Sequence, residues 1–433
     1  MKVLLLGFGR ANLPVAQYLV QKGDEVYVYD ENITGLSESA QKMISDGKVR
    51  MHDGDQYDLV VTSPGFPPHK SICKTLVASN VPIVDEIEFA YQELTGAKIV
   101  AVTGTNGKST TAAVISNIMC AARIENFLGG NISPGKPFSQ ALLEKKYEFY
   151  VLEISSFQLM RISDFHPHVA VVTNLSLDHL NWHKDFEEYK AAKFRIFLNQ
   201  GENDFAVLNY DDDWVRDLAT NIKSHAVFFG FHTREGVSIN GKFHYDDSEL
   251  FANTKLPLVG RHNLLNMAAS IAVAKILNID NQDIEKGLRT FKNLPHRLED
   301  LGSILGIRYI NNSMCTNATA AIASLQAIDG FKIVILGGKH KGDVGEAYFD
   351  VLMRQAKACV ILGENAHFIA DYFQNHGYKY YSIAQHMDDA VKKARSFARP
   401  GDTIVLNPGF ASFDNFVNFE ERGEAFKNAA RQD

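Results

Sequence analysis

The sequence predicts an α/β protein of three domains, each built around a mostly parallel sheet. Short, nearly continuous apolar runs recur along the chain and alternate with stretches of helical periodicity, as buried parallel strands and their crossover helices do. Several of these runs end in a glycine-rich turn. At 433 residues the chain is long enough for about three domains, each with its own core.

The overall composition is that of an ordinary globular protein. Hydrophobic residues make up 45% and charged residues 22%, and the net charge of −7 argues against a partner made of nucleic acid. Four scattered cysteines without a CxxC pair suit reduced thiols in a cytosol. The first apolar run is too short for a signal peptide, and none reaches the roughly 18 residues that span a bilayer. We therefore expect a cytoplasmic protein without membrane insertion.

Residues 1–95 are predicted to form a Rossmann-like domain. Strand-like runs begin at Val3, at Glu25 and at Asp58, and a helix-like run separates the first two. The turn from Gly7 to Asn12 lacks the third glycine of the dinucleotide fingerprint, although Asp30 stands about 20 residues on, where a ribose-binding acid would lie. The turn fits either a bound nucleotide or a purely structural connection, and the missing glycine weakens the case for NAD.

Residues 96–296 are predicted to form a central domain of the phosphate-loop ATPase type. The run from Thr103 to Thr110 joins a strand-like stretch to a helix-like one, so its backbone N–H groups and the helix dipole can face an anion. Lys108 can reach the β- and γ-phosphates, and Ser109 offers a hydroxyl to Mg²⁺. Val102 stands where the general pattern has its first glycine. The loop nevertheless predicts ATP binding.

Candidate catalytic groups follow the next strands of this domain. Glu153 ends an apolar run, where a carboxylate is costly to bury unless a cation meets it, although it could also face water. Asp178 and His179 follow another such run and should lie on the same rim, but a satisfied loop histidine is the more common explanation of any single one. On its residue pattern alone, Lys193 is an exposed lysine of an amphipathic helix.

Two further groups could bind a nucleotide or an anion. Asn263 and Asn266 share a helix face and could recognise a purine edge, or could serve as a cap and a surface residue.

Residues 297–433 are predicted to form a C-terminal Rossmann-like domain after a proline-containing linker. A loop of this domain carries three cationic or potentially cationic residues, which suggests an anion site or a solvated loop; they are Lys339, His340 and Lys341.

The order of several motifs resembles that of the Mur ligases. Besides the phosphate loop, the chain has Glu-Ile-Ser-Ser-Phe-Gln from Glu153, Asn-x₃-Asp-His-Leu from Asn174 and His-Asn-x₂-Asn from His262. Pro-His-Arg from Pro295 and Phe-Ala-Ser-Phe-Asp-Asn-Phe from Phe410 follow. The match spans all three predicted domains, and within the family it is closest to the members that add glutamate.

The resemblance implies a role for particular residues of this sequence. The first domain would hold the UDP of a UDP-sugar substrate through Gly7, Gly9, Asn12, Asp30, Glu31, Asn32, Ser63 and Gly65, with Asn131 and His179 from the second domain. ATP would be bound by Gly104, Thr105, Asn106, Gly107, Lys108, Ser109, Thr110, Asn263, Asn266, Arg297 and Asn312. The amino acid would be bound by Thr316, Lys341, Ser412, Phe413 and Phe419.

The resemblance also implies two Mg²⁺ ions, held by Ser109, Glu153, His179 and a carbamate on Lys193. The implied reaction joins UDP-N-acetylmuramoyl-L-alanine to glutamate in peptidoglycan precursor synthesis. The alanyl carboxylate attacks the γ-phosphate of ATP, and the amine of glutamate then attacks the acyl phosphate. Lys108, Glu153, His179 and Lys193 would be the catalytic residues. We expect a monomer whose domains close to keep water from the acyl phosphate.

The departures from the family pattern fall in one place. Where the family usually has Asn-Asp-Ser-Lys-Ala-Thr-Asn, this chain has Asn311-Asn-Ser-Met-Cys-Thr-Asn317, so Asn312 replaces a carboxylate and Met314 a cation. Asn407 stands where the family often has serine. Losing a cation near a dianionic amino acid should be costly, and we expect Lys339 to replace it. D-Glutamate is the default substrate, with L-glutamate or another acidic amino acid as the alternative.

Two other classes of function compete with this interpretation. Folylpolyglutamate synthases share the ATP loop and also add glutamate, but their loop lies near the N-terminus, whereas about a hundred residues precede it here. A non-catalytic binding protein that retained the fold is the other alternative. The presence of Lys108, Glu153, His179 and Lys193 argues against it.

Overall fold

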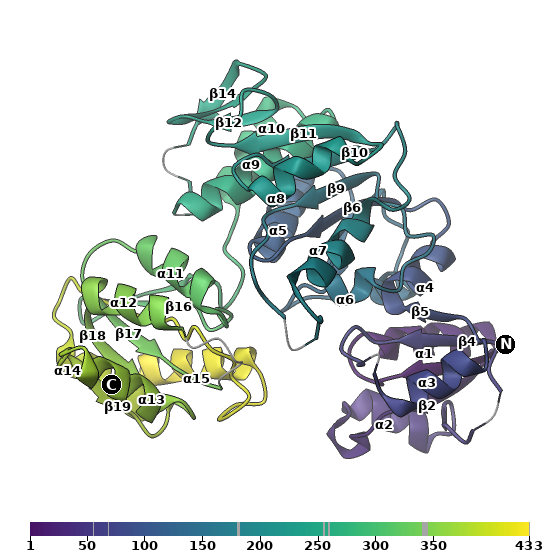
Figure 1. Cartoon of the computed structure of the whole chain (residues 1–433), viewed down its shortest axis with the longest axis horizontal. Helices are drawn as coiled ribbons and strands as arrows, with labels where there is room; N and C mark the ends of the chain where they lie inside the picture. Colours follow the sequence, from purple (N-terminus) through teal and green to yellow (C-terminus); the bar gives the residue numbers. More distant parts are fainter. Residues whose placement is uncertain are drawn as a thin grey trace. The chain divides into compact units, whose positions relative to one another are not determined.

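The computed structural model contains three separate sheets flanked by helices (Figure 1). It describes residues 1–54, 56–67, 69–179, 182–253, 256–258, 260–339 and 345–432. The chain forms two compact units, of which the first comprises Met1–Lys255 and Leu265–Phe291 and the second Leu256–Leu264 and Lys292–Asp433. The first unit holds two of the sheets and the second unit holds the third.

The N-terminal sheet has five parallel strands in the order β3-β2-β1-β4-β5. The strands are β1 (Lys2–Leu6), β2 (Glu25–Tyr29), β3 (Arg50–Met51), β4 (Leu59–Thr62) and β5 (Ile83–Asp85). The connecting helices are α1 (Asn12–Lys22), η1 (Ile33–Gly35), α2 (Glu38–Ser45), α3 (Ser71–Ala78) and α4 (Glu86–Glu93). The strand order reverses between β1 and β4, which is where such sheets bind their ligands.

The central sheet has nine strands in the order β14-β13-β12-β11-β10-β9-β6-β8-β7. The parallel part contains β6 (Lys98–Thr103), β7 (Asn126–Gly130), β8 (Phe149–Glu153), β9 (Val169–Val172), β10 (Phe205–Asn209) and β11 (His225–Gly230). Three further strands form one edge of this sheet: β12 (Val237–Ile239), β13 (Lys242–Tyr245) and β14 (Ser248–Ala252). In this edge, β13 pairs antiparallel with both of its neighbours. Because β8 and β9 flank β6, the segments after these three strands emerge side by side.

Helices of the central part surround this sheet. They are α5 (Lys108–Ala121), η2 (Phe138–Leu143), α6 (Ser156–Leu159), α7 (Phe186–Phe194), η3 (Arg195–Phe197), α8 (Asp213–Arg216), η4 (Asp217–Thr220), α9 (Arg261–Ile276) and α10 (Asn281–Thr290). Side-chain caps begin several of them: Ser155 forms a capping box with Gln158 on α6, and Asp185 accepts from Glu188 N at 2.9 Å on α7.

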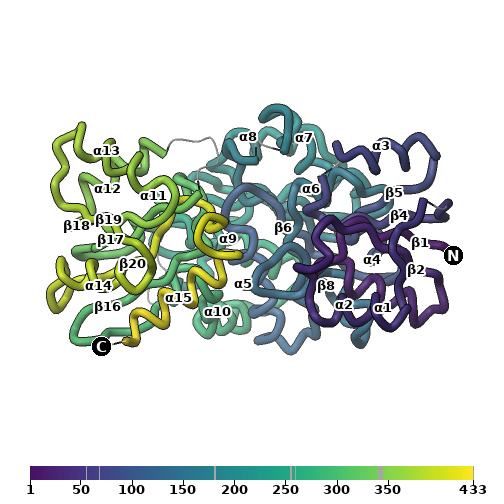
Figure 2. The backbone as a smooth tube through the Cα atoms, turned by 90° about the horizontal axis from the view of Figure 1, so that it is seen from below, coloured from purple at the N-terminus to yellow at the C-terminus, as the bar shows by residue number. Residues whose placement is uncertain are grey.

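The second unit has a six-stranded sheet in the order β15-β16-β20-β17-β18-β19. Its strands are β15 (Glu299–Ile304), β16 (Ile307–Asn311), β17 (Lys332–Leu336), β18 (Ala356–Ile361), β19 (Tyr381–Ile383) and β20 (Thr403–Leu406). Helices α11 (Ala318–Gln326), α12 (Glu346–Gln355) and α13 (Ala366–Asn375) cover one face, and α14 (Met387–Phe397) and α15 (Phe419–Arg431) cover the other (Figure 2). This is the three-layer arrangement of a Rossmann-like domain.

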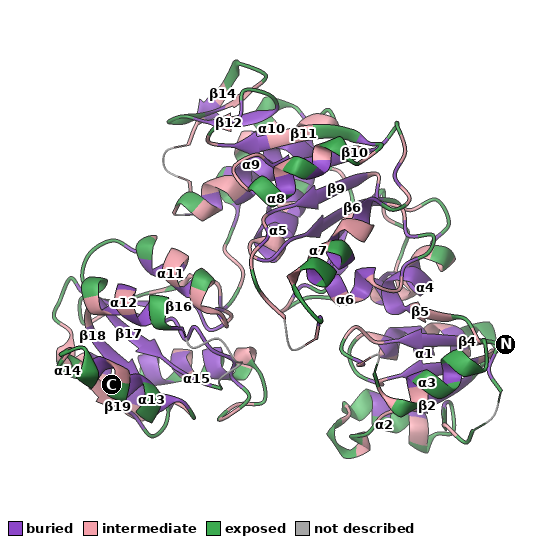
Figure 3. Cartoon of the chain, viewed as in Figure 1, coloured by how far each residue is buried: buried purple, intermediate pink, exposed green. Residues whose placement is uncertain are grey.

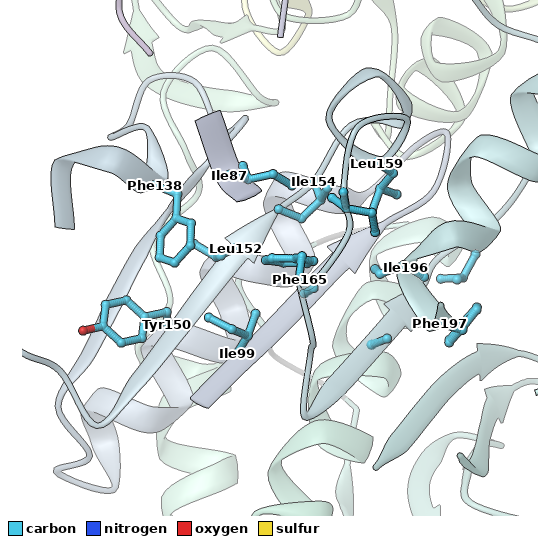
Figure 4. Close-up of a cluster of buried hydrophobic side chains, with 14 of the residues drawn as sticks. Ile87, Ile99, Phe138, Tyr150, Leu152, Ile154, Leu159, Phe165, Ile196 and Phe197 are labelled. Carbon is cyan, nitrogen blue, oxygen red and sulfur yellow. The ribbon is translucent and has the colours of Figure 1, made fainter. Parts of the chain in front are cut away.

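The central strands of all three sheets are buried, whereas the edge strands β3, β14 and β15 and the outer faces of the helices are largely exposed (Figure 3). In the first unit, Ile99, Tyr150 and Leu152 from the central strands pack with Ile87 from α4 and Phe138 from η2 (Figure 4). One hydrophobic cluster therefore joins α4 to the central sheet. Among the described residues, no helix is both long and apolar enough to cross a membrane.

The strand and helix predictions agree closely with this fold. The runs predicted to begin at Val3, Glu25 and Asp58 correspond to β1, β2 and β4. The antiparallel pairs at β12–β14 and β15–β16 were not predicted, because those strands are half-exposed and lack a continuous apolar run. The predicted limits 1–95, 96–296 and 297–433 remain predictions.

Candidate active site

The phosphate loop connects β6 to the N-terminus of α5. Gly104 and Gly107 have φ angles of 137° and 86°, which non-glycine residues rarely adopt. A side chain on Gly107 would also strike the amide of Asn266, which lies against the start of α5. Asn174, after β9, accepts from Asn106 N through its side chain at 2.9 Å and from Thr105 N through its carbonyl at 2.8 Å. The loop is therefore fixed by the neighbouring strand.

Ser109 and Glu153 meet at the N-terminus of α5. The Ser109 hydroxyl donates to Glu153 Oε2, and Asn131 Nδ2 donates to Glu153 Oε1 at 3.3 Å. Glu153 is only 2% exposed, so it does not face water. The Glu153 carboxylate and the Ser109 hydroxyl are oxygen donors of the kind that Mg²⁺ prefers. Lys108 donates to Thr105 O at 2.8 Å, within the same loop.

The described residues contain no group of three or more His, Cys, Asp or Glu side chains arranged to hold a metal. Any ion at Glu153 would therefore need oxygen ligands from Ser109, from a substrate or from a modified side chain. His179 lies on the loop after β9 with a φ of 56°, and its ring packs edge-on against Phe157 at 4.9 Å. Its Nε2 is 3.8 Å from Asp178 Oδ2.

Lys193 is buried, so the exposure expected from its residue pattern was wrong. Only 2% of the residue is accessible, and its Nζ donates to Gly104 O at 2.7 Å and lies 4.7 Å from the Tyr189 ring centroid. The helix pattern missed this because α7 packs its lysine side against the phosphate loop. Burial, and then the nearby charge of Lys108, hold the pKa of Lys193 well below its ordinary value.

The predicted ATP residues fall in both units. The segment Gly104–Thr110 and Asn266 belong to the first, whereas Asn263, Arg297 and Asn312 belong to the second. Asn266 Oδ1 accepts from Thr111 Oγ1 at 3.3 Å. Asn263 and Asn266 both lie on α9, three residues apart, as predicted.

A cavity of about 320 Å³ lies at the reversal point of the N-terminal sheet. It includes four of the predicted UDP-sugar residues, Gly9, Ser63, Gly65 and Asn131. The rest of its lining is Arg10, Ala11, Pro64, Glu86, Gly130, Ser133, Pro137 and Gln158. Because Asn131 also bonds to Glu153, the cavity adjoins the carboxylate beside the phosphate loop.

The other predicted UDP-sugar residues have contacts within the protein. Asn12 is fully buried and donates to the carbonyls of Leu6, Gly7 and Val61, which is a structural role. The Asp30 carboxylate accepts from two backbone N–H groups, those of Phe8 at 2.7 Å and Asn32 at 2.9 Å. Glu31 pairs with Lys70, and Asn32 caps η1. Gly7, with a φ of 79°, packs against Ser63.

Glu86 is a carboxylic acid in the cavity wall that the sequence analysis missed. It is fully buried, its Oε1 accepts from Ser139 N at 2.5 Å, and its Oε2 has no hydrogen-bond partner among the described residues. Burial raises its pKa from 4.5 to about 7, although the Ser139 hydrogen bonds and the charge of Arg10 oppose the shift. Nothing in its helical sequence context signals this.

Glu86 is expected to make the protein less stable as the pH rises. The folded state holds the proton more tightly than the unfolded state, so the stabilisation is complete below pH 4.5 and lost as the pH passes 7. Thermal unfolding should be measured for Glu86→Gln and the parent. Between pH 4 and pH 8, the free energy of unfolding of the variant should increase relative to that of the parent by up to about 3 kcal/mol. Asp85, whose pKa is also raised by burial, is common to both proteins. A constant difference across this range would contradict the assignment.

The predicted amino-acid residues lie around the carboxyl ends of β16, β20 and β17. Thr316 follows β16, Ser412 and Phe413 follow β20, and Phe419 begins α15. Ser412 is buried and Phe413 is exposed. Lys341 and His340 lie outside the described residues. Lys339 is exposed, and its backbone N–H donates to Ala411 O at 2.8 Å.

Two of the departures from the family pattern contact each other. Asn312 Nδ2 donates to Asn407 Oδ1 at 2.8 Å, and Asn312 Oδ1 accepts from Leu298 N at 3.0 Å. Asn407 Nδ2 donates to Ala321 O at 2.9 Å and Tyr348 Oη at 3.0 Å. Both amides are buried, so their orientation is fixed by these bonds.

Asn312→Asp should therefore destabilise the protein by about 1–3 kcal/mol, since a carboxylate would face the Asn407 carbonyl oxygen without a donor. Adding Asn407→Ser supplies a hydroxyl donor and should recover part of the loss. Denaturation of both single variants and the double variant gives the coupling free energy, which we expect to exceed about 1 kcal/mol. Additive effects would show that the two amides act independently.

Comparison with known proteins agrees with this geometry. Residues 102–274 match the Mur ligase middle domain, and residues 296–410 match the Mur ligase, glutamate ligase domain. The chain is 37% identical to the UDP-N-acetylmuramoylalanine–D-glutamate ligase of Pelotomaculum thermopropionicum, over 98% of this chain and 96% of that protein. It is 35% identical to the ligase of the same name from Streptococcus pneumoniae, with the same coverage. The chain belongs to the Mur ligase family.

Solved structures show the same fold at low identity. UDP-N-acetylmuramate–alanine ligase from Thermotoga maritima superposes with a TM-score of 0.67 at 18% identity, covering 100% of this chain and 99% of that one. Mycobacterium tuberculosis folylpolyglutamate synthase has a TM-score of 0.62 at 15% identity, covering 78% of this chain and 92% of that one. The three-domain α/β prediction is confirmed.

Proposed function

We propose that this chain is an ATP-dependent ligase that joins D-glutamate to UDP-N-acetylmuramoyl-L-alanine in cytoplasmic peptidoglycan precursor synthesis, as a monomer. The observation that carries the proposal is the 37% identity, over 98% of the chain, to a protein that bears the name of that activity. The buried Glu153–Ser109 pair beside the phosphate loop supports the ATP-dependent chemistry.

The first step would transfer the γ-phosphoryl group to the alanyl carboxylate, forming an acyl phosphate and ADP. Both reactants are anions, so their approach needs positive charge. Lys108 and the N–H groups at the start of α5 would provide it around the phosphates. Ser109 and Glu153 would hold Mg²⁺, which neutralises phosphate charge when bound.

Glu153 and His179 would hold a second Mg²⁺, and Lys193 would act as a carbamate that orients it. A carbamate forms when a neutral amine attacks CO₂, and the buried Lys193 amine has a pKa well below its ordinary value. The product is a carboxylate-like anion, which suits a site near the positive charge of Lys108, and its remaining N–H can still donate to the Gly104 carbonyl. Asn263, Asn266, Arg297 and Asn312 would bind the nucleoside and phosphates of ATP.

In the second step, the amine of glutamate would attack the acyl carbon and release phosphate. The amine must first lose a proton, and the bond broken is the carbonyl carbon–oxygen bond of the acyl phosphate. Thr316, Lys341, Ser412, Phe413 and Phe419 would bind the amino acid. Gly7, Gly9, Ser63, Gly65 and Asn131 would bind the UDP-sugar, whose site is supported by the cavity at the sheet reversal.

The deciding experiment measures ADP formation by the purified chain with UDP-N-acetylmuramoyl-L-alanine and a panel of D- and L-amino acids, with product masses. D-Glutamate-dependent ADP formation and a product heavier by one glutamyl residue are expected. Preference for L-glutamate or another acidic amino acid would correct the substrate. Turnover with a folate substrate instead would favour the folylpolyglutamate alternative, and no turnover with any pair would favour a binding protein.

A further inference from the structure

Arg422 on α15 is a buried cation that donates hydrogen bonds to neutral groups. Only 2% of it is exposed. Its Nε donates to Ser313 Oγ at 3.1 Å and its Nη2 to Ser313 O at 2.8 Å, while Nη1 donates to Phe410 O at 3.1 Å. All three acceptors are neutral, and no carboxylate of the described residues forms an ion pair with this guanidinium. A buried charge in that condition is costly.

The hydrogen bonds of Arg422 tie together the ends of two neighbouring strands, and the segment after a third strand lies close by. Ser313 follows β16 and Phe410 follows β20, whereas Gly338 follows β17. A Cβ on Gly338 would lie 3.2 Å from Arg422 Nη1. Ser313 Oγ also donates to Phe419 O at 2.7 Å, so the first residue of α15 joins the same group. These segments carry Thr316, Ser412, Phe413 and Phe419, the predicted amino-acid residues.

We propose that Arg422 is a positioning residue that selects an acidic amino acid, by holding these loops together and by placing one unneutralised positive charge beneath them. This inference rests on the proposed function, because it takes these loops to be the amino-acid site. The incoming substrate brings an anionic side chain, and none of the described residues supplies one in an ion pair with the buried guanidinium. Its charge acts through the loops, without touching the substrate.

Two other side chains near these loops, those of Met314 and Lys339, are weaker candidates for this role. Met314 is uncharged, and Lys339 is exposed, so water and salt screen its charge. Burial lowers the pKa of Arg422 to about 10, with Asp414 as the largest opposing charge, which leaves the side chain protonated at neutral pH. The Asp414 carboxylate is itself held by the backbone N–H of Glu364 at 2.8 Å.

The test compares Arg422→Gln and Arg422→Lys with the parent in full steady-state kinetics for ATP, UDP-N-acetylmuramoyl-L-alanine, D-glutamate and D-glutamine. Arg422→Gln removes the charge, and we expect the KM for glutamate to rise about tenfold. The attraction between two opposite unit charges roughly 10 Å apart in a protein corresponds to a change in affinity of about that size. The KM values for ATP and the sugar nucleotide should change less than about twofold. The rate with glutamine should not fall, because its side chain is neutral.

Arg395 provides a matched control in the same unit. It also donates to backbone carbonyls, those of Ala430 at 2.8 Å and Gln432 at 2.5 Å, but it ties α14 to the end of α15. Arg395→Gln should lower the melting temperature without changing the preference for glutamate over glutamine. Melting temperatures of all variants separate a folding defect from a kinetic one.

The outcomes are distinguishable. If Arg422→Gln lowers turnover of glutamate and glutamine equally, the residue is structural only and the inference is wrong. If Arg422→Gln does not fold, Arg422→Lys carries the test: it keeps the charge, so the glutamate KM should stay within about threefold, and a tenfold rise would overturn the role of charge. If the parent shows no amino-acid-dependent turnover, the proposed function fails and this inference fails with it.

Discussion

Replacing Glu153 by glutamine is expected to lower kcat for amide formation by at least about a thousandfold. Glutamine can accept from Asn131 through its carbonyl oxygen and donate its amide N–H to the Ser109 hydroxyl in the place where Glu153 accepts, so the fold should persist. What it loses is the negative charge that would hold a divalent ion beside the phosphates. Lys108→Ala should cause a loss of similar size, because it removes the mobile cation of the same loop. Steady-state ADP release measures both effects.

Glu88→Gln is a matched control for Glu153→Gln. Glu88 is equally buried in the same unit, and its carboxylate accepts from the backbone N–H groups of Ser163, Asp164 and Phe165. Neutralising Glu88 should lower the melting temperature of the protein and leave the kcat of the folded enzyme close to the parental value. If Glu153→Gln or Lys108→Ala turned over at the parental rate, phosphoryl transfer at this loop would be the wrong mechanism.

Lys193→Ala is expected to lower kcat at least about a hundredfold, and short carboxylates such as acetate or propionate should restore part of the activity. The reason is that alanine opens space beside Gly104 and Tyr189, where an added carboxylate can replace the proposed carbamate. Carbon-13 NMR of the parent equilibrated with labelled CO₂ should show a carbamate signal that is absent in the variant.

Lys190 lies on the same helix and provides the control. It pairs with Glu187 at 2.6 Å and stacks over Trp214, away from the phosphate loop. Lys190→Ala should retain parental kcat and should not respond to added carboxylates. If carboxylates fail to raise the activity of Lys193→Ala and the labelled signal is absent from the parent, Lys193 acts as an amine and the carbamate assignment is wrong.

Much of the fold could be predicted because its signals are local. Parallel strands buried on both faces are continuous apolar runs, which is why β1, β2 and β4 were located from sequence. The antiparallel edge from β12 to β14 was missed, since half-exposed strands carry weaker patterns. Asp30 and Asn12 were predicted from the spacing of a motif, but their contacts with backbone groups could not be read from it.

The candidate site was predicted to the extent that its residues fall in contiguous motifs. The sequence placed three segments at the ends of strands: the phosphate loop, Glu153 and the Asp178–His179 pair. The strands concerned, β6, β8 and β9, are neighbours in the sheet, so these segments lie side by side. Glu86 and Arg422 were not found, because each is an ordinary charged residue of a helix in sequence. Only their burial and their partners distinguish them.

The sequence by itself determined the α/β class, the positions of most parallel strands, the phosphate loop and the family resemblance, since each depends on residues close together in the chain. Tertiary structure alone decided that Lys193 is buried, that Asn312 bonds to Asn407, and that the buried Arg422 donates to neutral acceptors. Burial and pairing depend on which distant segments meet, and the free energy of a charge depends on what surrounds it.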